Sequence, residues 1–305
     1  MTRILSYNIL IGGTDRVDLL TKIIKSRQPD IVGLVEAIDQ QVVDALAENL
    51  GMQYRLSGRG KDSEGWQAAI LSHLPIVQTR TYTSEVMTKQ PLLEVCVQES
   101  NGCQLTVFVT HLTADFSKAW IANHARRREV QELLRIMSSR QGTPHLLMGD
   151  FNSLVPGERL KASSFLLYVT DPNLYYRLKP SRSIVPPDLN FVLPAPLQIL
   201  KPFLEFIPRS KVPCTLLDTT DFIYAPRGGI ELLQKARYVD CFRSMNPSES
   251  GFTWPAPLPS GRVDFIFASP ELAQRLVASD TVEAGEGVRT ENASDHLPVF
   301  AEFSE

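Results

Sequence analysis

The sequence has no marked excess of charge of either sign. Its 305 residues include 31 lysines and arginines and 34 aspartates and glutamates, which gives a formal net charge of −3. Proteins that act along duplex DNA usually carry a clear basic excess. The balance therefore disfavours a processive nuclease, although it does not exclude a nuclease.

Long apolar runs are also absent. No stretch approaches the ~18 consecutive apolar residues of a membrane-spanning helix, so we expect no transmembrane segment. The chain starts directly on a strand-like run at residues 3–8, without the charged and then apolar pattern of a secretory leader. We therefore expect a cytoplasmic protein.

Cysteine is scarce and unpatterned. The four cysteines form no CxxC pair and no zinc-ligand spacing: Cys96, Cys103, Cys214 and Cys241. Cys96 and Cys103 flank an expected hairpin turn at Asn101-Gly102. A two-residue turn there would pair Ser100 with Cys103 and place Cys96 opposite Val107, so the two sulfurs would not face each other. We expect four reduced thiols.

What the sequence does contain is an alternation of strand-like and helical runs. Hydrophobic residues make up 43% of the chain, enough for a large core. Strands are expected at residues 3–8, 31–35, 68–71, 93–98, 104–110, 145–148, 263–267 and 297–303. Helical spacing of apolar residues covers 17–24, 42–50 and 117–137, and Gly51 is a helix stop. In the last of these helices, Ile121 and Val130 are among the residues expected to face inward.

The pattern predicts one α/β domain over residues 1–305, with two mixed β-sheets packed face to face and helices outside them. One stretch departs from it. Residues 180–213 carry eight prolines between apolar clusters: Pro180, Pro186, Pro187, Pro194, Pro196, Pro202, Pro208 and Pro213. We interpret this stretch as an insertion packed on the main body.

Polar residues recur at the ends of the predicted strands. They are Asn8, Glu36, His111, Asp150, Asn152, Asp264, Asp295 and His296. A single carboxylate at a strand end is ordinarily a turn residue, but such a series is harder to explain that way, because strand ends can converge on one edge of a sandwich. Asp264 lies within an apolar strand, where a charge is costly unless it is paired. It therefore needs a histidine or arginine partner.

These residue types suit phosphoester hydrolysis. The reaction needs a hard cation, and the oxygen ligands of Glu36 suit Mg²⁺. It needs a carboxylate to position and deprotonate water, for which Asp150 is placed, and a carboxylate such as Asp264 to fix a histidine tautomer. Donors to the phosphoryl oxygens would be Asn8, Asn152, His111 and His296.

Six motifs occur in order from Ser6 to Val299. They are Ser6-Tyr7-Asn8, Gly33-Leu34-Val35-Glu36, Thr110-His111-Leu112, Gly149-Asp150-Phe151-Asn152-Ser153, Arg262-Val263-Asp264-Phe265-Ile266-Phe267 and Ser294-Asp295-His296-Leu297-Pro298-Val299. Together they resemble the endonuclease/exonuclease/phosphatase superfamily, the group of pancreatic-type deoxyribonuclease, AP endonucleases, inositol polyphosphate phosphatases and neutral sphingomyelinases. The resemblance implies the deoxyribonuclease I-like fold.

The resemblance also implies roles for the metal and the water. Glu36 would be the principal ligand of Mg²⁺ or Mn²⁺, with Asn8 beside it. Asp295 would complete the metal or water network. Asp150 would orient and activate the attacking water, and Asn152 would bind the phosphate.

Two histidines would complete the machinery implied by the resemblance. His296, held by Asp264, would contact a phosphoryl oxygen or assist proton transfer, and His111 would stabilise the pentavalent transition state. A histidine at this place is typical of the deoxyribonuclease and sphingomyelinase branches, so an abasic-site function is less expected. The deoxyribonuclease branch has a supporting carboxylate before a proline, where this chain has Gln90. We interpret Gln90 as a plain surface glutamine.

Two further features could have either a structural or a functional role. The run Arg126-Arg127-Arg128 is interpreted as a solvated helix face rather than a nucleic-acid contact. Trp254 lies shortly before the strand of Asp264, which makes it a candidate for the site rim and for stacking on substrate.

The expected function is a divalent-metal-dependent phosphoesterase that hydrolyses a phosphodiester or a phosphomonoester. Its substrate would be a phosphorylated small molecule, a lipid headgroup or a nucleic acid. The alternatives are a Mg²⁺-dependent nuclease, a sphingomyelinase-like lipid phosphodiesterase with the 180–213 insertion as a lid, and a non-catalytic binding module. The last is disfavoured because such modules usually lose a metal ligand or the Asp-His pair.

Overall fold

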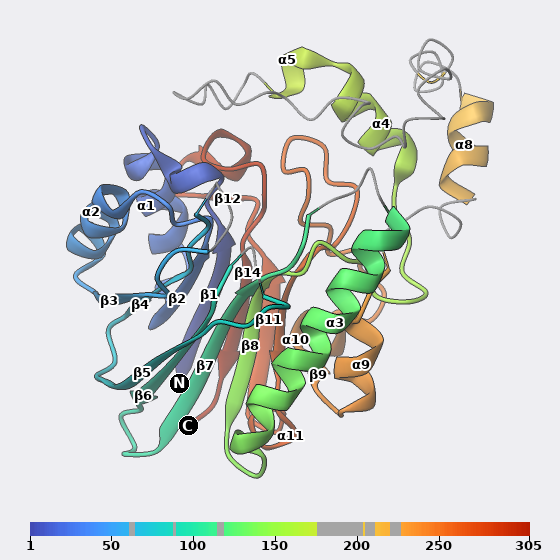
Figure 1. The fold of residues 1–305 in the computed structure, drawn as a ribbon. Coiled ribbons are helices and arrows are strands. Elements are labelled where there is room, and N and C mark those ends of the chain that lie inside the picture. Colours follow the sequence, from blue (N-terminus) through green and yellow to red (C-terminus); the bar gives the residue numbers. More distant parts are fainter. Residues whose placement is uncertain (61–64, 88–89, 115–118, 176–203, 205–210, 220–226) are drawn as a thin grey trace.

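The computed structural model describes residues 1–60, 65–87, 90–114, 119–175, 204, 211–219 and 227–305 (Figure 1). Two six-stranded sheets pack against each other. The first contains, in spatial order, β11 (Leu276–Thr281), β14 (Val299–Phe303), β1 (Thr2–Asn8), β2 (Ile31–Val35), β4 (Ala69–Ser72) and β3 (Gln53–Leu56). The second contains β5 (Ile76–Tyr82), β6 (Leu92–Gln98), β7 (Gln104–His111), β8 (His145–Asp150), β10 (Asp264–Ala268) and β9 (Val239–Asp240). A short ribbon pairs β12 (Ala284–Gly285) with β13 (Val288–Arg289).

Each sheet has one parallel pair of strands at its centre. β1 and β2 are parallel with Asn8 opposite Val35, and β7 and β8 are parallel with His111 opposite Asp150. Parallel neighbours require a crossover; α1 (Val17–Lys25) lies between the first two strands in the chain and α3 (Ala119–Met137) between the second two. Because parallel strands end at the same edge of a sheet, the last residues of each pair lie close together at that edge.

Helices cover the outer faces of both sheets (Figure 1). α1 and α2 (Gln40–Leu50) pack on the first sheet, and α3 and α9 (Ile230–Lys235) pack on the second. The strand period of two explains the layers: Ile4 of β1 points into the core between the sheets, whereas Leu5 points to α1 and α2. The predicted four-layer α/β sandwich is confirmed. α2 ends where predicted, because Gly51 adopts the left-handed conformation (φ 67°).

A further group of helices follows β8. It comprises α4 (Ala162–Thr170), α5 (Pro172–Tyr175) and α8 (Lys211–Thr219), which lie at the end of the sandwich opposite the two chain termini (Figure 1). Leu166 and Tyr168 of α4 join an apolar cluster with Trp254 and Leu154 of the main body. Most of the expected 180–213 insertion lies outside the described residues, and its described residue Leu204 packs against this cluster. Two further short α-helices are α10 (Cys241–Met245) and α11 (Pro270–Ala273).

The predicted hairpin turn is wrong by one residue. Glu99, not Ser100, lies opposite Cys103, whose carbonyl accepts a hydrogen bond from the Glu99 amide (2.8 Å), and Cys96 pairs with Thr106 rather than Val107. The loop therefore has three residues, the last of them Gly102 with φ 85°. Cys96, Cys103 and Cys241 are free thiols, as expected.

The inward face of α3 also differs from the prediction. Ile121 is 68% exposed, whereas Arg126 is fully buried. The guanidinium of Arg126 donates to the Thr113 carbonyl (2.7 Å) and to Asn123 Oδ1 (2.6 Å). The interpretation of the arginine run as a solvated face is thus wrong for Arg126, which is hydrogen-bonded to the loop that follows His111.

Within the part of the chain that the structure describes, no helix is both long enough and apolar enough to cross a membrane.

Gly149 makes a closer backbone approach than any side chain would allow. Its φ is 137°, and an added Cβ would lie 1.9 Å from the Thr110 carbonyl oxygen. An added Cβ on Gly33 would instead meet the flexible tip of Met148, at 2.3 Å from Cε. Gly149→Ala is expected to lower the free energy of unfolding by about 3 kcal/mol, and Gly33→Ala by about 1 kcal/mol. Urea unfolding of both variants tests this, and equal losses would contradict it.

Candidate active site

One asparagine side chain joins the two sheets where their parallel pairs end. Asn8 is buried, and its Nδ2 donates to Glu36 Oε1 and to Asp150 Oδ2, each at 3.1 Å. Its own Oδ1 accepts from the Leu10 amide at 3.0 Å. Glu36 follows β2 of the first sheet and Asp150 ends β8 of the second, so this amide fixes the distance between two carboxylates from different layers.

Glu36 is held in a strained backbone conformation. Its φ is 60°, which costs about 1–3 kcal/mol for a residue other than glycine. The surrounding hydrogen bonds hold it there: Glu36 Oε2 accepts from the Ile11 amide (2.7 Å), and the Glu36 carbonyl accepts from the Gly12 amide (2.8 Å). The loop after β1 therefore orients the carboxylate toward Asn8.

Asp150 is surrounded by partners on several sides. Its Oδ1 accepts from the backbone amide of Asn152 (2.8 Å), which itself has a φ of 47°. The Asn152 side chain donates to the Leu112 carbonyl (3.0 Å). His111 lies opposite Asp150 on β7, with its Nε2 3.6 Å from Asp150 Oδ2.

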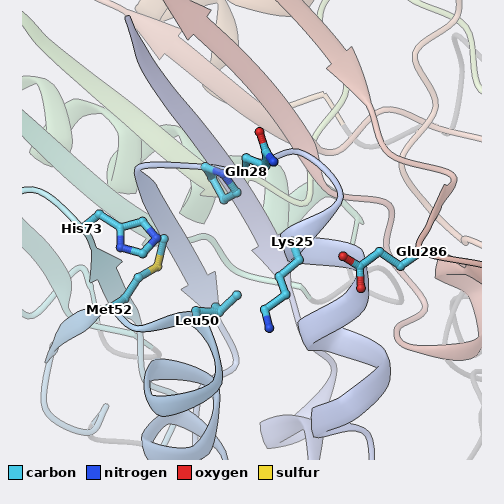
Figure 2. A pocket seen from close by; sticks show the side chains of 7 residues that line it. Lys25, Gln28, Leu50, Met52, His73 and Glu286 are labelled. Carbon is cyan, nitrogen blue, oxygen red and sulfur yellow. The ribbon is translucent and has the colours of Figure 1, made fainter.

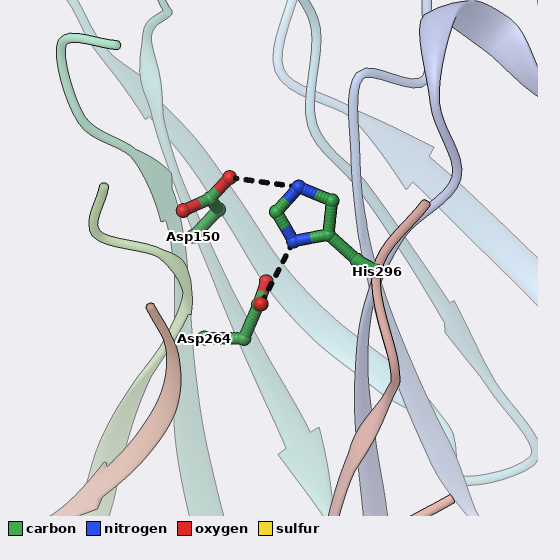
Figure 3. A group of neighbouring side chains, drawn as sticks. All are labelled: Asp150, Asp264 and His296. Carbon is green, nitrogen blue, oxygen red and sulfur yellow. Dashed lines mark hydrogen bonds and ion pairs between the residues drawn. The ribbon is translucent and has the colours of Figure 1, made fainter. Parts of the chain in front are cut away.

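Asp264 has the partner that its burial demands. Its Oδ2 lies 2.8 Å from His296 Nδ1, and His296 Nε2 lies 3.7 Å from Asp150 Oδ2 (Figure 3). The carboxylate of Asp264 accepts a hydrogen bond from the N–H at Nδ1 of His296, and the other ring nitrogen, Nε2, faces Asp150. Asp264 and Asp150 are directly opposite in the β8–β10 register, so the three side chains converge from two strands and the segment before β14.

Asp295 is held by the indole of Trp254. Trp254 Nε1 donates to Asp295 Oδ2 (3.2 Å), while the other oxygen, Oδ1, is buried without a hydrogen bond. The Trp254 side chain is only 9% exposed. It lies at the site, but packed inside it and not at an open rim, and its contact with substrate stays a prediction.

Burial shifts the ionisation of this group of residues. Burial, followed by the nearby charge of Asp264, raises the pKa of Asp150 to about 8. Burial and then the Asp295 carboxylate raise the pKa of Glu36. Burial alone would lower the pKa of His296, but Asp264, Asp295 and Asp150 together raise it well above its ordinary value. Acidic groups crowded in a low-dielectric site favour a bound cation.

The donor set fits a hard divalent cation. Asp150, Asp264 and His296 offer atoms within 4.8 Å of one another. Asp264 Oδ2 and His296 Nδ1 already bond to each other (Figure 3). Among the described residues, Glu36 Oε1 accepts a hydrogen bond from the Asn8 amide, and Asp295 Oδ1 is buried without a hydrogen bond. Carboxylate oxygens of this kind suit Mg²⁺ or Mn²⁺.

The structure adds supporting residues that the sequence did not single out for a role. Ser294 Oγ donates to the Asn8 carbonyl (2.6 Å). The buried guanidinium of Arg16 donates to the carbonyls of Ala293 and Leu10. These bonds tie the loop after β1 to the Asp295–His296 segment. Ser294 belongs to a recognisable motif, whereas no pattern marked Arg16. Trp66 contacts His111 edge to face, with ring centroids 6.0 Å apart.

Gln90 is not the surface residue that was expected. It is 4% exposed, and within the described part of the chain neither polar atom of its side chain has a hydrogen bond. It lies just before β6, a strand with neighbours on both sides, and this position buries it.

A surface pocket lies away from these residues (Figure 2). Pro29, which precedes β2, and Lys25, at the end of α1, are among its lining residues, with Glu286 beside them. β2 has Pro29 before one end and Glu36 after the other, so the pocket is at the opposite edge of the first sheet. None of the predicted site residues lines it.

The chain resembles known proteins in sequence and in fold. The model of the Endonuclease/Exonuclease/phosphatase family matches residues 5–296. The chain belongs to this family. A search of curated proteins found no match.

Solved structures share the fold across the whole chain. A 3′ phosphatase, NExo, from Neisseria bound to a product DNA hairpin is 17% identical, with 100% of both chains covered and a TM-score of 0.61. An AP endonuclease from Archaeoglobus fulgidus is 18% identical, with 100% of both chains covered and a TM-score of 0.60. A functionally unknown conserved protein from Enterococcus faecalis is 15% identical, with 99% of both chains covered and a TM-score of 0.63. At these identities the likeness concerns the fold.

The raised pKa of Asp150 makes a prediction about stability. Because its pKa is raised to about 8, the neutral form is favoured in the folded state, and this contribution to stability is lost as pH rises through the folded pKa. In EDTA at about pH 9, Asp150→Asn should therefore be more stable than the wild type by about 1–2 kcal/mol, with a smaller difference at about pH 5. Denaturant unfolding at both pH values measures it; an equally or less stable variant at the higher pH would sink the prediction.

Proposed function

We propose that the protein hydrolyses a phosphoester with a water molecule oriented by Asp150, assisted by Mg²⁺ or Mn²⁺. The observation that carries the proposal is the convergence on Asp150. Its carboxylate lies between Asn8, His111 and His296, which come from separate strands and loops. A buried carboxylate whose pKa lies near neutral pH is suited to accept a proton from water.

Glu36 and Asp295 are the proposed cation ligands, with Asn8 beside them. The carboxylate of Glu36 is oriented by the Ile11 amide and the Asn8 side chain, and that of Asp295 by the Trp254 indole. The other oxygen of Asp295 is buried and has no hydrogen bond within the part of the chain that the structure describes. A bound Mg²⁺ or Mn²⁺ would neutralise charge on the phosphoryl oxygens.

The histidines and Asn152 are proposed to act on the phosphoryl group. His296 is raised in pKa and held by Asp264 through Nδ1, so its Nε2 can donate a proton or a hydrogen bond to a phosphoryl or leaving-group oxygen. His111 approaches Asp150 from the neighbouring strand β7 and is proposed to contact the same phosphoryl group. Asn152 is proposed to bind the phosphate.

A nuclease or nucleic-acid 3′ phosphatase is the second candidate. Two solved structures with this fold are described as a 3′ phosphatase bound to a DNA hairpin and as an AP endonuclease. Trp66 beside His111 offers an aromatic ring on which a base could stack. The net charge of −3 favours a small or single-stranded substrate over long duplex DNA.

The alternatives are separated by a substrate panel. Purified protein with Mg²⁺ or Mn²⁺ is incubated with single-stranded DNA, duplex DNA, RNA, sphingomyelin, inositol phosphates and an aryl phosphodiester. Cleavage of sphingomyelin alone would favour the lipid phosphodiesterase, and cleavage of none would favour the binding module.

Asp150→Asn and His296→Ala should each reduce kcat by about 10³-fold or more, because each removes a group proposed to move a proton. Matched controls are Asp280→Asn and His73→Ala, whose side chains are exposed. Circular dichroism and thermal unfolding establish that the variants fold. Activity within a few-fold of wild type in either site variant would overturn the proposed mechanism.

Metal removal provides a separate test of Glu36. EDTA should abolish activity, and added Mg²⁺ should restore it. Glu36→Gln should raise the Mg²⁺ concentration for half-maximal activity by about 10-fold or more, since an amide is a weaker ligand than a carboxylate. Glu48→Gln, on the exposed face of α2, is the control. An unchanged metal requirement in Glu36→Gln would exclude Glu36 as a ligand.

A further inference from the structure

Trp254 lies at the base of a loop that supports two acidic residues of the site, Asp264 and Asp295. The loop closes on itself through a bridge between Trp254 and Gly261. The Thr253 carbonyl accepts from the Leu297 amide (2.8 Å), and the Ala256 amide donates to the Asp295 carbonyl (2.6 Å). The backbone on both sides of the Trp254 ring is therefore tied to the residues on either side of His296.

The same loop sets the start of β10. Thr253 Oγ1 accepts from the amides of Val263 (3.1 Å) and Asp264 (3.2 Å). Asp264 is the carboxylate that holds His296. This loop thus aligns Asp264 through the Thr253 hydroxyl, and Asp295 and Leu297 on either side of His296 through its main chain. The Trp254 indole reaches from the loop to Asp295.

The indole of Trp254 contacts the predicted site residues and also the helix α4. On the site side, its N–H donates to Asp295 Oδ2 (3.2 Å), and its ring lies 6.1 Å from the His296 ring at an angle of 35°. On the α4 side, the centroid of the Trp254 ring lies 5.0 Å from that of Phe165 and 6.2 Å from that of Tyr168. The ring therefore lies between the catalytic segment and the helix that follows the Asp150 strand.

We propose that Trp254 is a positioning residue for the cation site, and that α4 holds it in place. The inference rests on the proposed function. A carboxylate rotates readily about its last torsion. The indole N–H engages Oδ2 of Asp295 and leaves Oδ1 for the cation, and the aromatic packing of Phe165 fixes the indole. Partners that orient a metal ligand in this way typically contribute about 10- to 100-fold in metal affinity.

This role differs from stacking on substrate. A ring that is 9% exposed presents little surface to a substrate. Loss of a stacking residue would raise KM and leave metal affinity unchanged. Loss of a positioning residue would weaken metal binding and, at saturating metal, leave KM nearly unchanged.

The test is Trp254→Phe, which keeps an aromatic ring and removes the N–H. Mn²⁺ binding to the substrate-free protein is measured by isothermal titration calorimetry, and kcat and KM are measured with an aryl phosphodiester at saturating Mn²⁺. The expected result is a Kd for Mn²⁺ about 10- to 100-fold higher, with KM changed less than about 2-fold. Tyr54→Phe is the matched control. It likewise removes an aromatic donor to a carboxylate, because the Tyr54 hydroxyl on the edge strand β3 donates to Asp44 on α2.

Phe165→Leu provides a second, independent variant. It keeps the indole N–H and changes only the packing behind the ring, so Mn²⁺ binding should weaken in the same direction by a smaller factor. It also serves if Trp254→Phe does not fold. Wild-type affinity in Phe165→Leu would overturn the dependence on α4.

The outcomes separate the two proposals. Wild-type Mn²⁺ affinity in a folded Trp254→Phe, or a raised KM with unchanged affinity, would overturn the positioning role while leaving the proposed function intact. A wild-type protein that binds no Mn²⁺ would overturn the metal-dependent function, and the inference with it.

Discussion

The site depends on one hydrogen-bonding side chain, the amide of Asn8. Its two donated bonds reach carboxylates on different sheets, Glu36 and Asp150, each at 3.1 Å. The amide can serve both only if the sheets keep their separation and register, which is set by close contacts such as that of Gly33 with Met148. The packing of the two sheets therefore fixes the distances between the side chains of the site.

This arrangement is electrostatically unfavourable, because it buries several acidic side chains close together. Glu36, Asp150, Asp264 and Asp295 are all buried within one region, and the pKa values of Glu36 and Asp150 are raised. A fold selected for stability alone would not gather four buried acids around two histidines in this way. The strained backbone at Glu36 and Asn152 adds to the cost. Such concentrations of unfavourable terms are typical of functional sites, where a ligand or cation relieves them.

The central strands could be predicted from the sequence and the edge strands could not. Strands with neighbouring strands on both sides, such as β2 and β8, appear in the sequence as apolar runs and are easily recognised. In the two six-stranded sheets, the strands that were missed, β3, β5, β9 and β11, are the four edge strands, and β5 is almost wholly exposed. The short ribbon of β12 and β13 was missed as well. Polar edge strands carry little hydrophobic signal. The predicted site residues stood at strand ends, and the structure gathers them there. The burial of Trp254, Arg126 and Gln90 depends on tertiary contacts that no local periodicity encodes.

The pairing of β1 with β14 joins Thr2 to Phe303 across almost the whole sequence. A ribosome releases β1 long before β14, so the nascent first sheet has an open edge beside β1 until the last strand arrives. Such an edge can pair with other chains. The segment that fills it follows directly after Asp295 and His296. During synthesis, closing this edge of the first sheet and bringing Asp295 and His296 next to Asn8 and Asp150 are therefore the same late event.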